Sequence, residues 1–184
     1  MSTESLLARL LAASDGFALI GAWARNAWAP PRATTDLDLV VRADAKTLAD
    51  LATVLEHESY RAVRRQRVAA SDALPDIEIY RAEDEDLCQV DLLIAKTAFE
   101  VQALDRALSV ELHELRLPVV TPEDLVVYKL LANRGRDQDD VRAVVRTQLR
   151  AGRTLDWDHI VKWSSYWGIE ERAAALQREL TRGA

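Results

Sequence analysis

The N-terminal part of the chain carries two kinds of apolar pattern. Leucines between positions 6 and 11 recur at helical spacing behind Ser2 and Thr3, which are good helix N-caps. An amphipathic first helix is therefore expected. Residues 17–20 form a short apolar run that ends at Gly21, and residues 23–28 suit a helix. This order predicts a strand, a glycine turn and a short helix.

The next segments alternate between strand and helix patterns. Residues 36–41 alternate acidic and apolar side chains, as a strand with one polar end does, and residues 45–56 suit a helix. Residues 77–81 and 88–94 read as two strands joined by the acidic turn 83–86. A short connection of this kind predicts an antiparallel hairpin, so the sheet is expected to be mixed.

The character of the chain changes near Thr121. Before it, residues 97–107 suit a helix, and residues 110–120 read as extended, with Pro118 predicting an edge position because proline cannot donate to a ladder. From Thr121 onward, segment 121–124 combines an N-cap, a proline at the first helical position and two carboxylates. Three further helical patterns follow, so the last third is predicted to be all helix.

Together these patterns predict an α/β (α+β) fold with a small mixed sheet, flanking helices and a C-terminal helical lobe. The expected domains are an α/β core over residues 1–120 and a helical lobe over residues 121–184. Because no Gly/Ser-rich linker separates them, we expect two lobes packed together.

Composition narrows the class of protein. The chain has 184 residues, of which 49% are hydrophobic and 29% charged, as in ordinary globular domains. Neither a membrane span nor a signal sequence is apparent, which predicts a cytoplasmic protein with no membrane partner. The single cysteine, Cys88, allows no internal disulfide. A net charge of −6 disfavours tight electrostatic nucleic-acid binding, although a basic face around Arg61, Arg64, Arg65 and Arg67 can hold an anionic partner.

Three acidic residues form the main candidate site. Asp36 and Asp38 lie two residues apart in a predicted strand, so their side chains project from the same face of that strand. Their Cβ atoms are then about 6–7 Å apart. Asp91 begins the apolar end of another predicted strand and joins them if the strands are neighbours. Each like-charged pair at about 4 Å costs on the order of 4 kcal/mol. A hard cation, Mg²⁺ or Mn²⁺, would relieve that repulsion and still leave positions for substrate phosphates.

An alternative interpretation needs no metal. Asp36 then begins a strand, Asp38 is a solvated side chain, and Asp91 is an unrelated acid. The turn at Gly21-Ala22 favours the site, because backbone N–H groups and a helix dipole converge on an anion at a strand-to-helix turn. On its own, however, Gly21 is also explained by a tight turn that requires a positive φ.

The motifs resemble those of minimal nucleotidyltransferases of the polymerase-β-like superfamily. Residues 19–24 (LIGAWA) and 31–40 (PRATTDLDLV) are similar to the glycine turn and double-aspartate strand of that group. Residues 90–93 (VDLL) are similar to its third-carboxylate strand. Residues 117–125 (LPVVTPEDL) and 129–141 (KLLANRGRDQDDV) look like the helical tail of the abortive-infection and toxin–antitoxin (AbiEii-like) branch. Ala22 departs from the family, which has Gly or Ser there.

The resemblance implies a reaction and a metal site. Asp36 and Asp38 would hold two Mg²⁺ ions that bridge a nucleoside triphosphate, and Asp91 would act as a base or a further metal ligand. Attack on the α-phosphate would release pyrophosphate. The expected catalytic and metal residues are thus Asp36, Asp38 and Asp91, with Lys129 as a fourth catalytic residue.

The resemblance also implies a set of nucleotide-binding residues. Lys129 would neutralise charge on the β- and γ-phosphates, while Asp137 and Asp140 orient it. Gly21, Ala22 and Arg32 complete the expected set. Alternatively, Lys129 is a solvated helix lysine, and Arg32 pairs with Asp36 or Asp38.

Three functions remain open at this point. The first is an enzyme that transfers a nucleotide to a tRNA end or a protein hydroxyl and that has a cognate toxin or antitoxin partner. The second is a catalytically idle protein that uses the same cleft to bind a partner, as an antitoxin. The third is a small-molecule nucleotidyltransferase of the aminoglycoside type. The intact set of three aspartates favours the first over the second, because a pure binder gains nothing from uncompensated carboxylates.

Overall fold

The computed structural model describes residues 2–66, 76–82 and 88–182. The chain divides into two compact units. The first comprises Met1–Trp23 and Ala33–Val120, and the second comprises Ala24–Arg32 and Thr121–Ala184. Helix α2 (Gly21–Trp28) therefore begins in the first unit and ends in the second.

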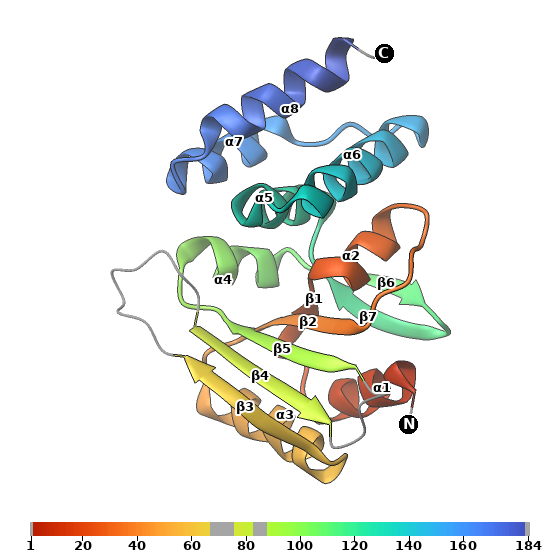
Figure 1. The fold of residues 1–184 in the computed structure, drawn as a ribbon, viewed down its shortest axis with the longest axis vertical. Helices are drawn as coiled ribbons and strands as arrows, with labels where there is room; N and C mark the ends of the chain where they lie inside the picture. The colour runs from red at the N-terminus through yellow and green to blue at the C-terminus, as the bar shows by residue number, and fades with distance from the viewer. Residues whose placement is uncertain (1, 67–75, 83–87, 183–184) are drawn as a thin grey trace. The chain divides into compact units, whose positions relative to one another are not determined.

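The first unit is built on a mixed sheet, which over the described residues has seven strands in the order β3-β4-β5-β2-β1-β7-β6 (Figure 1). The strands are β1 (Phe17–Leu19), β2 (Asp36–Val41), β3 (Tyr60–Gln66), β4 (Asp76–Ala82), β5 (Gln89–Ile94), β6 (Leu108–Leu112) and β7 (Leu115–Val119). β2 runs parallel to β5 and β1 runs parallel to β7, whereas all other neighbours are antiparallel. The predicted mixed sheet and fold class are confirmed.

Helices α1 (Thr3–Ala13), α3 (Ala45–His57) and α4 (Ala98–Asp105) complete this unit. Their starts follow from side-chain caps: Ser2 accepts from the N–H of Ser5, Asp44 accepts from that of Thr47, and Thr97 begins a capping box. α1 contacts α3, and Figure 1 shows α3 behind β3 and β4. Alternate residues of β2 and β5 are fully buried on one face of the sheet; they are Leu37, Leu39, Val41, Val90 and Leu92.

The second unit is helical outside residues 29–32 and the connections between helices. Its helices, apart from the end of α2, are α5 (Pro122–Ala132), α6 (Gly135–Arg150), α7 (Trp157–Tyr166) and α8 (Glu170–Arg182). Thr121 caps α5, and its hydroxyl donates to Asp124 Oδ2 at 2.6 Å. The other oxygen of Asp124 lies 2.6 Å from His159 Nε2, which joins α5 to α7 in the buried interior. The predicted all-helical tail is confirmed. No helix in the described ranges is long and apolar enough to span a membrane.

Residues 110–120 were expected to form one extended segment, but they belong to the antiparallel hairpin of β6 and β7, whose turn lies at His113 and Glu114. Two further details of the sheet differ from the sequence-based expectation. Pro118 was expected in an edge strand, but it lies in β7, which has β1 on one side and β6 on the other. The proline is tolerated because the pairing of β1 with β7 is confined to Leu19 and Val119. The second difference is β3, which the apolar pattern did not predict. The acidic turn 83–86 and Arg67 lie outside the described residues.

Candidate active site

The register between β2 and β5 decides where the three acidic side chains lie. These strands are parallel neighbours, with Asp38 opposite Asp91 and Asp36 opposite Gln89. Residues opposite one another in a ladder project to the same face, and so do residues two apart on one strand. Asp36, Asp38 and Asp91 therefore share one face of the sheet. The expectation that their strands are neighbours is confirmed.

The side chain of Asp38 lies against the glycine turn that begins α2. Gly21 has a φ of +60°, and a Cβ built on it would lie 1.9 Å from Asp38 Oδ2. Gly21 is thus required twice, for its left-handed backbone and for the space that the carboxylate occupies. The backbone N–H of Ile20 donates to the carbonyl oxygen of Asp38 at 3.0 Å, which holds the two segments together. Ala22 is 8% exposed and, unlike serine, offers no hydroxyl here.

The surroundings of Asp91 shift the pKa of its carboxyl group. Burial raises the pKa of its carboxyl group, and the nearby charge of Asp36 raises that pKa further. Gln89 Nε2 donates to Asp91 Oδ1 at 2.8 Å, and Arg81 Nε donates to Gln89 Oε1 at 3.1 Å. These two contacts favour the charged form but do not outweigh burial. Asp91 is therefore a carboxylate with increased affinity for a proton.

The donor chemistry of this face fits a hard divalent cation. Asp36, Asp38 and Asp91 offer oxygen atoms alone, which Mg²⁺ and Mn²⁺ prefer. Over the part of the chain that the structure describes, no group of three or more His, Cys, Asp or Glu side chains forms a cage that could hold a metal ion. Mg²⁺ does not need such a cage, because it is usually held by one or two carboxylates together with water and substrate phosphates.

A second charged group lies in the helical unit and contains the remaining predicted residues. Lys129 is 7% exposed, and its Nζ donates to Asp137 Oδ1 at 2.8 Å and to Asp140 Oδ2 at 2.9 Å. Arg32 holds Asp140 with two hydrogen bonds, from Nε at 3.0 Å and from the terminal nitrogen at 2.9 Å. Lys129 is thus not a solvated helix lysine, and Arg32 is paired with Asp140.

Two further arginines join this group. Arg25 Nε lies 3.3 Å from Asp140 Oδ1, and Arg134 Nε lies 2.7 Å from Asp137 Oδ2. Burial raises the pKa values of Asp137 and Asp140, but the hydrogen bonds and charges of their cationic partners outweigh it and keep both pKa values below the ordinary value. Sequence reasoning missed Arg25, because a lysine or arginine in a short helix carries no signal of a distant partner.

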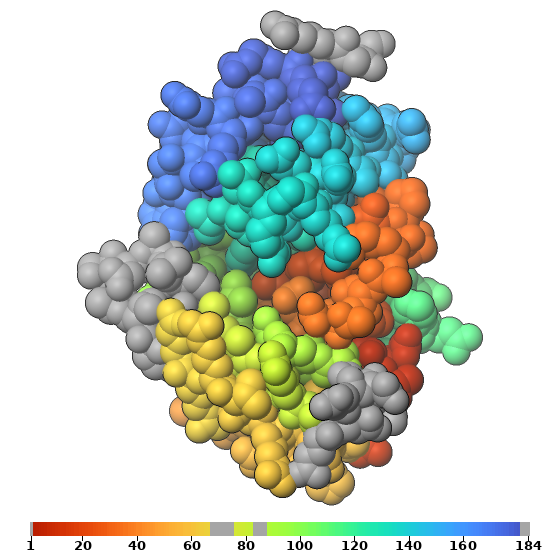
Figure 2. All heavy atoms as spheres, in the orientation of Figure 1, coloured from red at the N-terminus to blue at the C-terminus, as the bar shows by residue number. Residues whose placement is uncertain are grey.

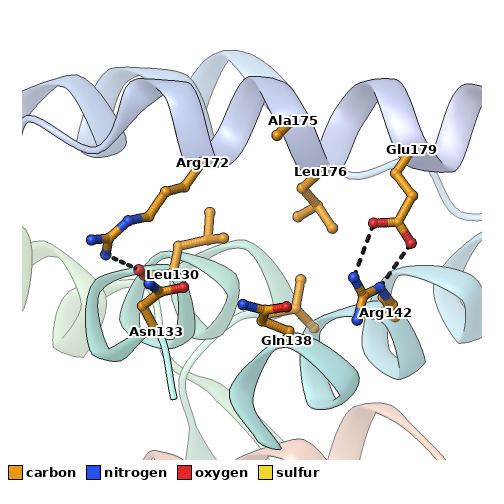
Figure 3. A pocket seen from close by; sticks show the side chains of 9 residues that line it. Leu130, Asn133, Gln138, Arg142, Arg172, Ala175, Leu176 and Glu179 are labelled. Carbon is orange, nitrogen blue, oxygen red and sulfur yellow. Dashed lines mark hydrogen bonds and ion pairs between the residues drawn. The ribbon is translucent and has the colours of Figure 1, made fainter. Parts of the chain in front are cut away.

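The helical unit also contains a small pocket (Figure 3). It has a volume of about 210 Å³ and is lined from α5, α6 and α8. Its charged side chains already have partners within the unit: Arg172 donates to the carbonyl oxygen of Leu130 at 2.8 Å, and Arg142 pairs with Glu179 at 2.8 Å. The pocket therefore presents no convergent set of unsatisfied polar groups.

Comparison with protein families gives a match that spans most of the chain. A family model described as "Nucleotidyl transferase of unknown function (DUF2204)" matches residues 8–181. No curated protein matches the chain.

Similar folds occur among solved structures. The solution structure of the antibiotic-resistance factor ANT(2'')-Ia has a TM-score of 0.62 at 16% identity, over 99% of this chain and 100% of that one. The crystal structure of ANT(2'')-Ia in complex with adenylyl-2''-tobramycin has a TM-score of 0.57 at 16% identity, over 96% and 97% of the two chains. At these identities the similarity concerns the fold alone.

Proposed function

The chain belongs to this family of nucleotidyl transferases, and from that premise we propose that it transfers a nucleoside monophosphate from a nucleoside triphosphate to a hydroxyl group of RNA or protein, with Mg²⁺ or Mn²⁺. The observation that carries the proposal is the placement of Asp36, Asp38 and Asp91 on one face of the sheet, with Asp38 against the start of α2. Two segments far apart in the sequence thus place these three residues on the same face of the sheet.

Asp36, Asp38 and Asp91 are the residues that would hold the cation. When bound, a divalent cation supplies positive charge that neutralises phosphate oxygens and the developing negative charge of phosphoryl transfer. The backbone N–H groups at Gly21 and Ala22 begin a helix, where an anionic phosphate is favoured by the helix dipole.

We assign to Asp91 the role of accepting the proton of the acceptor hydroxyl. The oxygen of the acceptor hydroxyl attacks the α-phosphorus, the bond between that phosphorus and the pyrophosphate oxygen breaks, and the hydroxyl proton passes to the carboxylate of Asp91. A general base must lie within reach of the proton that it accepts, and the register of β5 with β2 places Asp91 opposite Asp38 on the proposed catalytic face. Pyrophosphate leaves with the electron pair of the broken bond.

Lys129, Arg32, Asp137 and Asp140 are proposed as nucleotide-binding residues on the basis of the sequence resemblance. Within the helical unit, four cations contact two carboxylates, Asp137 and Asp140; the cations are Arg25, Arg32, Lys129 and Arg134. An ammonium group has three donors, and two of those on Lys129 are engaged by Asp137 and Asp140. The third suits a phosphate oxygen.

A second candidate is transfer to a small alcohol of the aminoglycoside type, which the fold similarity to ANT(2'')-Ia favours. An idle binding protein is disfavoured, because three carboxylates on one face repel one another without a cation. The toxin–antitoxin or phage-defence setting, with a cognate partner, rests on the resemblance of the helical tail to the AbiEii-like branch.

Thermal unfolding in the presence of metal and nucleotide tests the proposal. A ligand at 100 times its Kd stabilises the folded state by about 2.7 kcal/mol, which corresponds to a rise of roughly 5–10 °C in the melting temperature of a chain of this size. We expect Mg²⁺ with at least one triphosphate to give such a rise, and Asp38→Asn to abolish it. Asp50→Asn, which alters a partly exposed aspartate on α3, is the matched control and should retain the rise. An unchanged rise in Asp38→Asn would refute the assignment.

A further inference from the structure

Edge strand β3 places two arginines on the face that carries the aspartates. In antiparallel pairs, opposite residues share a face. Arg64 is opposite Ile79, Ile79 is opposite Asp91, and Asp91 is opposite Asp38, so these residues form one row across four strands. Arg61 is opposite Arg81, whose Nε donates to Gln89 beside Asp91. We call Arg61, Arg64 and Arg81 the arginine strip.

A β-bulge brings this strip together. Arg61 and Arg64 are three residues apart, so in a regular strand they would project to opposite faces. The register shifts between Ala62 and Arg64, which makes Val63 an extra residue and returns Arg64 to the face of Arg61. Arg65, the next residue, then projects to the opposite face, where its Nε lies 3.9 Å from Glu78.

The strip presents exposed positive charge. All three of its arginines are exposed, and Figure 2 shows β3 (yellow) beside β4 and β5 (yellow-green) on the visible surface. Arg64 donates to the amide oxygen of Gln66, and Arg81 donates to that of Gln89. Amide oxygens are neutral, so neither of these two hydrogen bonds neutralises a guanidinium charge, although the charge of Arg81 also acts on the carboxylate of Asp91.

The spacing between strip and aspartates suits a polymer. Neighbouring strands are about 4.8 Å apart, so three strand spacings from β3 to β2 amount to about 14 Å. At roughly 3.4 Å per stacked nucleotide, that length corresponds to about four nucleotides. A chain whose terminal hydroxyl lies at the aspartates can therefore extend its preceding phosphates across β4 to β3.

We propose that the arginine strip binds the phosphate backbone of a single-stranded RNA, and that this RNA is the acceptor. The inference rests on the proposed function and narrows its acceptor from RNA or protein to RNA. Guanidinium groups hold phosphate oxygens with charge-assisted hydrogen bonds. They also repel a polycation such as an aminoglycoside, so the strip opposes the alternative acceptor class.

The inference is tested by an RNA-binding measurement. A fluorescent 12-nucleotide single-stranded RNA is titrated with the full chain, and its anisotropy is measured at several salt concentrations. The strip variant is Arg61→Gln/Arg64→Gln/Arg81→Gln. The matched control, Arg42→Gln/Arg65→Gln/Arg116→Gln, loses the same charge from exposed arginines of the same unit that lie outside the strip. Melting curves verify folding, and Arg81→Gln alone is used if the triple variant does not fold.

We expect at least a tenfold loss of affinity in the strip variant and less than about a twofold loss in the control. The slope of log K against log salt should become shallower by up to about 2, because each lost contact with a single strand contributes about 0.7. Equal losses in both triple variants would overturn the inference. So would tighter binding of a 12-residue polyglutamate peptide or of tobramycin than of RNA.

Two further outcomes separate this inference from the proposed function. If wild type shows the melting rise with Mg²⁺ and triphosphate but binds RNA no better than the strip variant does, the acceptor assignment fails and the nucleotidyltransferase survives. If no triphosphate gives a rise, the proposed function itself fails. RNA binding that appears only after amide substitution of the four acids at 83–86 would show that the chain's own carboxylates occupy the strip, and would also overturn it.

Discussion

Gly21 tests the geometry around Asp38 at the scale of a single residue. In Gly21→Ala the new methyl group would lie 1.9 Å from the Asp38 carboxylate, on a backbone with a φ of +60°. The left-handed conformation costs roughly 1–2 kcal/mol, and the steric conflict adds about 1–3 kcal/mol. We therefore expect a loss of unfolding free energy of about 2–5 kcal/mol in urea titrations. The melting rise with Mg²⁺ and triphosphate should also disappear, because the carboxylate must move.

Gly152→Ala provides the control for Gly21→Ala. Gly152 has a φ of +71°, but a Cβ there would meet nothing within 4 Å. Its replacement should cost only the roughly 1–2 kcal/mol of backbone strain and leave the nucleotide effect intact. Equal losses of stability in the two variants would show that the contact between Gly21 and Asp38 has no energetic consequence.

Substitution of Lys129 distinguishes its proposed role in phosphate binding from a purely structural role. Lys129→Met should lower stability by about 3–5 kcal/mol, because it leaves Asp137 and Asp140 with fewer cations in a buried site. If its third donor reaches a phosphate, triphosphate affinity should fall by a further 10- to 100-fold, about 1.5–3 kcal/mol, while monophosphate affinity barely changes. Calorimetry with ATP and AMP measures both.

The exposed Lys46 supplies the control for this measurement, since Lys46→Met should alter neither affinity. Equal losses for triphosphate and monophosphate in Lys129→Met would leave Lys129 with a structural role alone.

At the scale of elements, the buried charges of α5, α6 and residues 24–32 predict that the free energy of unfolding depends on pH. The folded pKa of Asp140 lies below its ordinary value of 3.8, so its stabilising contribution is complete above that value and is lost as pH falls through the folded pKa. Asp140→Asn should cost about 3 kcal/mol at neutral pH. In urea titrations the difference from wild type should shrink as pH falls below 3.8 toward the lowered folded pKa of Asp140, because wild-type Asp140 then also takes up its proton. A difference that stays constant with pH would contradict this account.

Elements with strong local signals are predictable from the sequence, and others are not. Strand β2 follows from the alternation of Asp36 to Val41, and α5 follows from the cap at Thr121. Strand β3 escaped prediction because it is an edge strand in which five consecutive residues are exposed, so it lacks apolar alternation. Its bulge at Val63 depends on pairing with β4, which no local pattern reveals.

The candidate site shows the same division. The same-face spacing of Asp36 and Asp38 is a local property, whereas the meeting of Asp38 with Asp91 depends on the pairing of β2 with β5. The contacts of Lys129 with Asp137 and Asp140 follow the motif order, yet the burial of all three depends on tertiary packing. Sequence patterns therefore specify which residues carry chemistry better than they specify which residues surround them.

At the scale of the whole molecule, the two units have separate charged groups. The aspartates belong to the first unit, and the lysine–arginine–aspartate group belongs to the second. The second unit includes residues 24–32, which are far in sequence from its other helices and which supply Arg25 and Arg32. A single boundary at Thr121 does not predict that residues 24–32 belong to the second unit, because helix α2 is shared by both units.

The central claim is that the whole chain transfers a nucleoside monophosphate by means of Asp36, Asp38 and Asp91. Its most direct test is covalent labelling of RNA by the purified protein with Mg²⁺ and each triphosphate, labelled either at the α- or at the γ-phosphate. We predict attachment of the α-label and no attachment of the γ-label. Asp36→Asn/Asp38→Asn should reduce labelling on the order of a hundredfold or more, since several kcal/mol of transition-state stabilisation are lost, while Asp50→Asn labels as wild type does. Transfer of the γ-label, or undiminished α-labelling by the double variant, would contradict the claim.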